Sequence, residues 1–426
     1  MLKVFHTDDP ETFKSKALFW ANSFDTACYF DSNNFSDPYS AFEVYIGAGK
    51  TKELSDSGKN SFTALEDFLA KTKGYIPGYF SYDLKNETED LLSENPDHLY
   101  FPKIHFFLPK HSILIKNNEV SIFSDSADEV WNLIHQTSLK QSEEPVSIPA
   151  ILSRFERNEY IQTVQEIQKH IQRGDIYEIN FCQEFYVENA EIDPLEVFIA
   201  LNKLSPTPFA NYFKINEQYI ISATPERFLS RRGNKLISQP IKGTSSRNTD
   251  ASRDKKQKEE LRKNEKERAE NVMIVDLVRN DLTKSAKPGT VRVEELFGIY
   301  SFKLVHQMIS TVVCEADEKL SNAGIIANTF PMGSMTGAPK IRAMQLAEKY
   351  ERSKRGVYSG AVGYFAPDGD FDFNVVIRTI LYNAKQKYLS FHVGSAITLD
   401  SDPEKEYEEC LLKGKAIRDV LKQNNP

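Results

Sequence analysis

Three pairs of neighbouring strand-like segments constrain the fold of this chain more than any other sequence feature. Each pair is rich in β-branched and aromatic residues and is joined by a short polar turn: residues 112–115 with 120–123, 209–215 with 218–222, and 357–366 with 371–382. Such residues favour strands, and a short turn connects antiparallel neighbours, because a parallel pair needs a crossover of about a dozen residues or more. The sequence therefore predicts antiparallel sheet.

Helical segments lie between these strands. Residues Tyr160, Val164, Ile167 and Ile171 recur at the spacing of one helix face, and Gly174 follows as a stop signal. Asp193-Pro194 has the pattern of a second helix start, and a short helix is expected over residues 127–138. Helices beside antiparallel hairpins indicate an α+β fold.

A polar, proline-bearing stretch at residues 140–150 is the best candidate for a linker. Residues 1–139 before it form an aromatic-rich N-terminal region. Residues 151–426 after it form the larger region, which carries the motifs described next. A chain of 426 residues suits one large domain or two to three ordinary ones.

Charge and composition exclude several classes of function. The formal net charge is −8, which argues against nucleic-acid binding because neutralising phosphates requires a basic surface. The chain has no apolar stretch of about 18 residues that would indicate a membrane span, and its N-terminus lacks the apolar core of a signal peptide. Cys28, Cys182, Cys314 and Cys410 form no Cys-x-x-Cys pair, so we expect reduced thiols, no zinc site and a cytoplasmic location.

One lysine stands out in the larger region. Lys242 lies in the stretch Pro240-Ile241-Lys242-Gly243-Thr244, where proline restrains the approach and glycine leaves room for a ligand beside the backbone. The amides of Gly243 and Thr244 could donate to an anion. The alternative is a strand-end lysine that points into water, which is the usual environment of an isolated stretch of this kind.

Two Glu-x-x-Glu pairs raise the question of a cation site. Glu267 and Glu270 lie where a charged run becomes apolar, and Glu406 and Glu409 repeat the spacing near the C-terminus. Residues three apart share a helix face, so two such helices could bring carboxylates together around Mg²⁺. The pattern also arises by chance in a chain with 61 acidic residues, and spacing alone favours that interpretation.

Together these stretches resemble the chorismate-utilising enzymes. The resemblance covers about residues 153–423 and rests on ordered motifs at residues 174–180, 224–228, 240–244, 266–281, 333–340 and 402–413. It implies two facing antiparallel sheets with peripheral helices and an active site in the cleft between the two halves. The closest branch is aminodeoxychorismate synthase component I, which converts chorismate and ammonia to 4-amino-4-deoxychorismate in the para-aminobenzoate branch of folate synthesis.

The resemblance implies Mg²⁺ as a cofactor. Glu270 and Glu409 would bind the metal directly, and Glu267 and Glu406 would act through water. Chorismate is a dicarboxylate, and its ring carboxylate would rest on the metal and on amides near Gly394.

Arg378 and Tyr358 would meet the enolpyruvyl carboxylate of chorismate, because a guanidinium fork suits two oxygens. The alternatives are a structural ion pair for Arg378 and a core aromatic for Tyr358. The remaining candidates for substrate binding are Gly243, Thr244, Thr336 and Lys413.

Three catalytic residues are implied by the same resemblance. Glu226 occupies the general-acid position, which requires a pKa raised by burial or by nearby carboxylates. Lys242 would attack the ring as the hydroxyl leaves, so we expect its pKa to be lowered. His306 matches a family histidine near the reacting ring, with a purely structural histidine as the alternative.

The resemblance also implies a partner protein and leaves alternative functions open. Ammonia would come from a separate glutamine amidotransferase subunit, since we find no glutaminase-like segment in the sequence. Glu178 and the pair Ser395-Ala396 depart from the family pattern. Anthranilate synthase component I is the alternative activity, and a non-catalytic chorismate-binding homologue is a rival of another class.

Overall fold

Strands from both predicted regions pair in one hydrogen-bonded network. The computed structural model describes residues 2–56, 58–139, 148–303 and 305–423, so residues 140–147 of the expected linker lie outside the described residues. Every strand pairing in the described part is antiparallel. The strands are β1 (Leu2–His6), β2 (Thr26–Asp31), β3 (Val44–Asp56), β4 (Ile76–Phe80), β5 (Ile104–Lys116), β6 (Glu119–Phe123), β7 (Leu152–Ser153), β8 (Glu178–Glu188), β9 (Phe209–Ile215), β10 (Gln218–Thr224), β11 (Arg227–Arg232), β12 (Lys235–Gln239), β13 (Ile241–Ser246), β14 (Arg292–Ser301), β15 (Val305–Glu315), β16 (Gly337–Ala338), β17 (Ala361–Phe365), β18 (Phe371–Val375), β19 (Thr379–Asn383) and β20 (Tyr388–Ile397).

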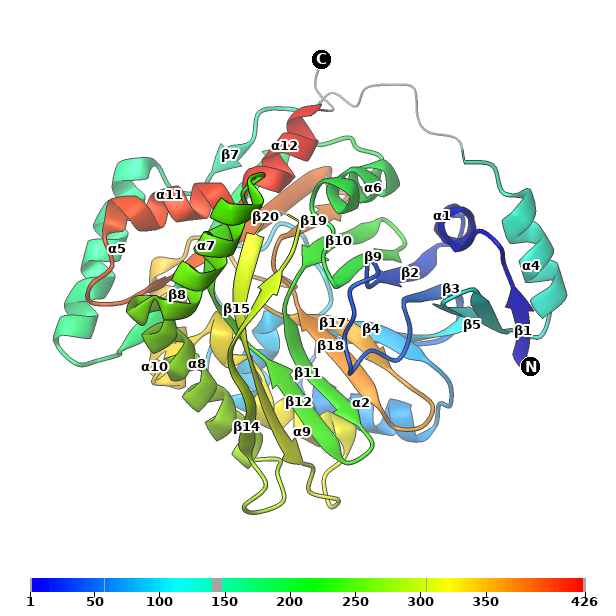
Figure 1. Cartoon of the computed structure of the whole chain (residues 1–426), viewed down its shortest axis with the longest axis horizontal. Helices are drawn as coiled ribbons and strands as arrows, with labels where there is room; N and C mark the ends of the chain where they lie inside the picture. Colours follow the sequence, from blue (N-terminus) through cyan, green and yellow to red (C-terminus); the bar gives the residue numbers. More distant parts are fainter. Residues whose placement is uncertain (1, 57, 140–147, 304, 424–426) are drawn as a thin grey trace.

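Helices cover the outside of this network, with one group beside β8 and β15 and another beside β1 and β3 (Figure 1). Two short 3₁₀ turns, Tyr82–Leu84 and Gly333–Met335, complete the regular structure of the described residues. The helices are α1 (Pro10–Asn22), α2 (Ser61–Ala70), α3 (Lys85–Thr88), α4 (Ala127–Gln136), α5 (Arg157–Gln172), α6 (Pro194–Leu204), α7 (Ala251–Lys263), α8 (Glu265–Thr283), α9 (Asn322–Thr329), α10 (Lys340–Tyr350), α11 (Pro403–Lys413) and α12 (Lys415–Gln423).

The long strands β3 and β5 are where the network divides into two arms. They pair along their lengths, while β5 also pairs with β6 at one end and with β4 at the other. From β3 the first arm continues through β2, β9, β10, β19, β20 and β8. From β4 the second arm continues through β17, β18, β11, β12 and β15, which pairs with both β13 and β14. The N-terminal strands therefore start both arms.

The apolar core forms two clusters. The first lies between the strands of the first arm and helices such as α5, α6 and α11, and includes Ile179 and Phe391. The second takes side chains from both arms, among them Phe213 of β9, Phe106 of β5 and Phe373 of β18. Aromatic rings bury large apolar areas, so the second cluster holds the arms together.

Two facing antiparallel sheets with peripheral helices were expected; the mixture of helices with antiparallel strands is confirmed, as are the hairpins β5–β6, β9–β10 and β17–β18. The strands form one network and not two separate sheets, because β3 and β5, at 13 residues each, are long enough to pair with both arms.

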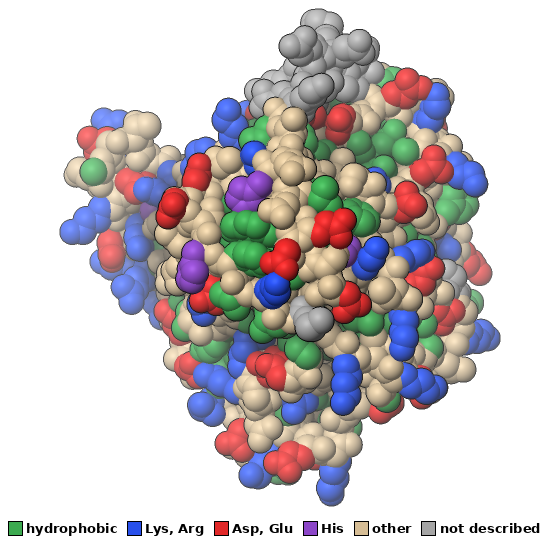
Figure 2. Space-filling view, turned by 90° about the vertical axis from the view of Figure 1, so that its right-hand side faces the viewer, with side chains coloured by type: hydrophobic (Ala, Val, Ile, Leu, Met, Phe, Trp, Pro, Cys, Tyr) green, Lys and Arg blue, Asp and Glu red, His purple; other side chains and the backbone are tan. Residues whose placement is uncertain are grey.

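The surface carries charges of both signs (Figure 2), and the thiols lie in the interior. On the face shown in Figure 2, acidic and basic side chains are interspersed. No described helix combines the length and the apolar character that spanning a membrane requires. The four cysteines are buried and unpaired.

A buried ion network joins the second arm to the loop before β3. The Arg227 guanidinium donates to both carboxylate oxygens of Asp372 at 2.9 and 3.0 Å, and it also binds Asp37 and Gln239. Burial opposes the charged form, yet Asp372 and Asp37 raise the pKa of Arg227 further above its ordinary range. A buried charge is stable only when it is paired in this way.

Removing one carboxylate from this network should destabilise the fold. We predict that Asp372→Asn lowers the free energy of unfolding by about 3 kcal/mol, since it leaves the buried Arg227 incompletely neutralised. The exposed turn residue Asp368 provides a matched control, and Asp368→Asn should change stability by less than about 0.5 kcal/mol. Urea denaturation measures both, and equal effects of the two substitutions would contradict the prediction.

Candidate active site

Lys242 lies on a β-bulge. Strand β12 ends at Gln239, and Pro240, which has no N–H to donate, precedes β13. The four residues of β13 from Ile241 to Thr244 then lie opposite only three of β15, from Ile309 to Gln307, so the register shifts at Lys242-Gly243. Gly243 has φ +98°, and a Cβ there would lie 3.1 Å from Oε2 of Glu267. The bulge changes the direction in which the Lys242 side chain points, and the absence of a side chain at Gly243 permits the close approach of α8.

The ammonium group of Lys242 is buried and paired. Its Nζ donates to Oε1 of Glu178 at 2.9 Å, and the two side chains are 12% and 11% exposed. Burial opposes the charged form, but Glu178, Glu270 and Glu226 together raise the pKa of Lys242. The expectation of a lowered pKa is therefore wrong for this state of the protein, because the carboxylates outweigh desolvation.

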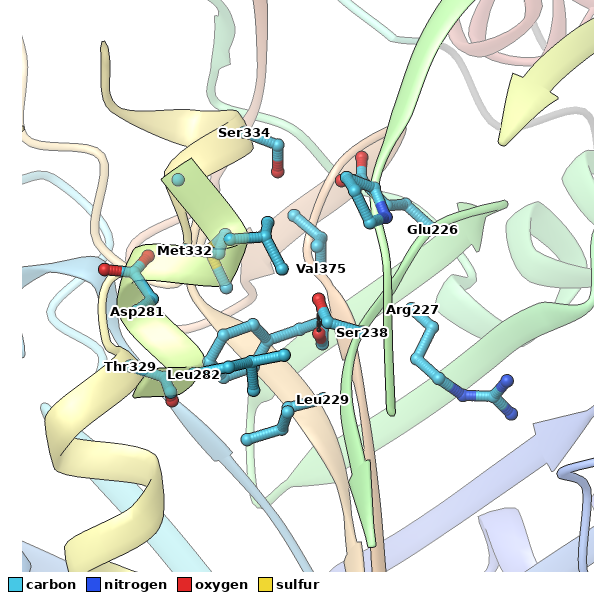
Figure 3. Close-up of a pocket in the computed structure, with 14 residues that line it drawn as sticks. Glu226, Arg227, Leu229, Ser238, Asp281, Leu282, Thr329, Met332, Ser334 and Val375 are labelled. Carbon is cyan, nitrogen blue, oxygen red and sulfur yellow. Dashed lines mark hydrogen bonds between the residues drawn. The ribbon is translucent and has the colours of Figure 1, made fainter. Parts of the chain in front are cut away.

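Glu226 lies at the other side of this charge cluster, in the turn between β10 and β11. It borders a small cavity whose wall includes Ser334, Met332 and Val375 (Figure 3). Burial raises the pKa of Glu226 to about 7, although a hydrogen bond with Ser334 and the charges of Lys242 and Lys413 oppose the shift. A carboxyl with this pKa can hold a proton near neutrality and release it to a leaving group.

Three of the four predicted metal ligands influence one another electrostatically. Burial raises the pKa of Glu267, with Glu409 adding to the shift, and burial together with Glu267 raises that of Glu270. The pKa of Glu409 is lowered, because Lys413 at 2.7 Å outweighs its burial. Helices α8 and α11 therefore bring carboxylates close enough to repel, a situation that a divalent cation would relieve.

The oxygen donors suit Mg²⁺, but they are not arranged as a closed ligand set. Glu270 lies 3.8 Å from Lys266, and Glu409 is paired with Lys413. In the described part of the chain, no group of three or more His, Cys, Asp or Glu side chains is placed to hold a metal ion. Glu406 is buried on α11, where it contributes, after burial and Cys410, to the raised pKa of Tyr160.

Arg378 and Gln307 line a second small cavity together with Pro225 and Thr207. The Arg378 guanidinium forms no hydrogen bond or ion pair with any described residue; burial lowers its pKa, and the carboxylate of Glu226 opposes that shift. The buried Oε1 of Gln307 likewise has no hydrogen-bond partner among the described residues. A partly buried cation without an ion-pair partner suits an anionic ligand.

His306 is engaged away from these residues. Its Nδ1 lies 2.9 Å from the Ser301 hydroxyl and its Nε2 lies 3.0 Å from Oδ1 of Asp254 on α7. Successive strand residues point to opposite faces, so it is the next residue, Gln307, that lines the cavity with Arg378. The structure places His306 in a contact between β15 and α7.

Other predicted binding residues have partners within the protein. The Thr336 hydroxyl donates to the carbonyl of Gly333 at 3.1 Å, and the Tyr358 ring stacks on His392. The Gly394 carbonyl accepts from Nζ of Lys413 at 2.9 Å, which ties β20 to α11. Thr244 is exposed at the edge of the bulge.

Three residues that the sequence did not single out as contacts help to build the site. Glu178 pairs with Lys242, and the Ser334 hydroxyl bonds Glu226. Asn271, fully buried, donates from Nδ2 to the Lys242 carbonyl at 3.4 Å and accepts from the Ser310 hydroxyl at 2.6 Å. Asn271 directly follows Glu270 in the sequence, and this position was the one sequence signal that could have identified it as a site residue.

Comparisons with known proteins give the context of this site. The chorismate binding enzyme family matches residues 16–419. Anthranilate synthase component 1 of Saccharolobus solfataricus is 34% identical, over 84% of this chain and 83% of that protein. Aminodeoxychorismate synthase component 1 of Klebsiella aerogenes is also 34% identical, over 79% of this chain and 74% of that protein.

The fold has a solved counterpart. A crystal structure of anthranilate synthase component I from Streptococcus pneumoniae has a TM-score of 0.79 with this chain, covering 89% of it and 92% of that chain, at 23% identity. At this identity the similarity is one of fold. The family match, by contrast, spans nearly the whole sequence and contains every site residue described above. The chain belongs to the chorismate binding enzyme family.

Proposed function

We propose that this chain is the chorismate-binding component of an aminodeoxychorismate synthase, which replaces the ring hydroxyl of chorismate by an amino group. The observation that carries the proposal is the buried amine of Lys242. It lies within one charge cluster with Glu226, a carboxyl whose pKa is about 7. A nucleophile and a general acid in one cluster suit displacement of a hydroxyl group.

Four residues of the site have separate roles in this reaction. Glu226 donates its proton to the departing hydroxyl, which leaves as water. Lys242, after losing a proton, attacks the ring as the hydroxyl leaves, and ammonia then displaces it at the carbon that bore the hydroxyl. The unpaired guanidinium of Arg378 holds a substrate carboxylate, and Lys413 faces the substrate from α11.

Mg²⁺ would be held by Glu270 and Glu409, with Glu267 and Glu406 acting through water. Bound there, the ion supplies positive charge for a substrate carboxylate and neutralises the mutual repulsion of the glutamates. The lysines that now pair with Glu270 and Glu409 have to give way to it.

Ammonia would come from a separate glutamine amidotransferase subunit. The relative from Klebsiella aerogenes is named as component 1, and that designation supports a second component here. Chorismate is the small-molecule partner.

Anthranilate synthase component I remains the second candidate, because relatives of that name are as similar in sequence as the aminodeoxychorismate synthases. The two activities differ in product from the same substrates, since one eliminates pyruvate. Chromatographic identification of the product formed from chorismate, Mg²⁺ and ammonium separates them.

Replacing Lys242 tests the branch. We predict that Lys242→Ala lowers the rate of 4-amino-4-deoxychorismate formation by about 100-fold or more but still binds chorismate, because the carboxylate contacts lie elsewhere. Lys242→Arg should not restore activity, since arginine stays protonated. Mass spectrometry of stopped wild-type reactions should detect a protein species heavier by one dehydrated chorismate. If Lys242→Ala kept the wild-type turnover, Lys242 would not be the nucleophile and would serve only as a positioning cation.

Replacing Glu226 tests the general acid through a gain in stability. With a folded pKa of about 7 and an unfolded value near 4.5, this carboxyl makes its full contribution to stability below about pH 4.5. That contribution is lost as the pH rises to 7, by about 3 kcal/mol in total. Glu226→Gln should therefore abolish turnover yet raise the Tm at pH 8, with a difference that disappears toward pH 4.5. An unchanged or lower Tm at pH 8 would contradict this assignment.

Removing the metal ligands tests the Mg²⁺ proposal. Glu270→Gln and Glu409→Gln should each lose Mg²⁺-dependent activity while the proteins stay folded, because each removes one carboxylate from a site that offers few. Titration of activity with Mg²⁺ and far-UV circular dichroism measure the two effects. Undiminished wild-type turnover in excess chelator would rule out a metal requirement.

A further inference from the structure

Glu178 already binds one ammonium group in this structure. The Nζ of Lys242 lies 2.9 Å from its carboxylate, and within the described residues this is the one hydrogen bond that either side chain makes. Glu178 is also fixed in place, because it opens β8 opposite Ala338 of β16. The neighbouring Gly337 approaches so closely that a Cβ there would lie 2.2 Å from the Glu178 carbonyl.

The carboxylate lies one residue from the protein surface. Tyr177, directly before it, is 71% exposed, whereas Glu178 is buried. Glu178 is therefore buried on a strand whose backbone is held in place by β16.

The proposed reaction takes the ammonium group of Lys242 away from Glu178. When Nζ loses its proton and bonds to the ring, Glu178 is left as a buried carboxylate without a counter-ion, which is a costly state. An ammonium ion is the species that reproduces the lost contact, because it has the same charge and the same N–H donors as the lysine head group.

We propose that Glu178 is the binding site of the incoming ammonium ion, which occupies the place that Lys242 vacates. This inference rests on the proposed function and names the residue that receives its nucleophile. Ammonium bound to Glu178 transfers one proton to the carboxylate and becomes ammonia. The ammonia nitrogen bonds to the ring carbon that bore the hydroxyl, the bond between the ring and Nζ breaks with its electron pair going to Nζ, and the protonated amino product passes a proton to Nζ. Lys242, again cationic once Glu178 returns its proton to Nζ, re-forms the ion pair.

The kinetic test compares three proteins: wild type, Glu178→Gln, and the control Glu188→Gln, which makes the same charge change at the exposed end of the same strand. The KM for ammonium chloride should rise at least about tenfold in Glu178→Gln, since a hydrogen bond to a charged group is lost. The control should keep the wild-type KM. Without ammonium, Glu178→Gln should still form the covalent Lys242 species seen by mass spectrometry.

Two outcomes overturn the inference. One is a wild-type KM for ammonium in folded Glu178→Gln. The other is a folded Glu178→Gln that cannot form the Lys242 species, which would show that Glu178 acts only on the lysine. Failure of the proposed function is distinguishable, because wild type itself would then form another product or no Lys242 species.

A binding measurement does not depend on turnover or on the stability of Glu178→Gln. In Lys242→Ala the carboxylate has lost its internal ammonium group, so ammonium chloride should raise the Tm of that variant more than sodium chloride at equal ionic strength. Wild type, in which Lys242 fills the place, should show no such difference. Equal effects of the two salts on Lys242→Ala would also overturn the proposal.

Discussion

The site depends on one electrostatic requirement, which is that the buried ammonium group of Lys242 be neutralised. Carboxylates from three separate places satisfy it: Glu178 at the start of β8, Glu226 in the turn after β10, and Glu270 on α8. Each belongs to an element that the sheet or its covering helices hold in position. The division of the network at β3 and β5 thus has a functional consequence, because β8 lies on the first arm and β13 on the second.

The same requirement makes the site costly to maintain. Glu226 is buried and Glu267 and Glu270 are partly buried, and their raised pKa values show that the charged forms of these carboxylates are disfavoured. A protein selected for stability alone would replace such groups. Their presence beside an unpaired guanidinium, Arg378, is what a site for a charged substrate and a cation needs.

Local features of the site were predictable where they depend on neighbouring residues. The helical spacing of Glu267 and Glu270 does place them on α8 near a second helix, α11, that carries Glu409. The raised pKa of Glu226 also follows the expectation from its proposed role. His306 contacts Asp254, and it is the next residue, Gln307, that lines the cavity with Arg378, because successive residues of a strand point to opposite faces.

The sequence by itself determined the antiparallel hairpins, the α+β class and the proline and glycine that shape the stretch around Lys242. These are consequences of dihedral limits and of spacing along the chain. Only the tertiary structure decided that Lys242 is an ion-paired cation, because Glu178 lies 64 positions away in the sequence. The tertiary structure also brings the carboxylates of the site close enough to affect one another's pKa, and it places Gln307 beside Arg378. Burial and charge coupling depend on distances through space, which no local pattern encodes.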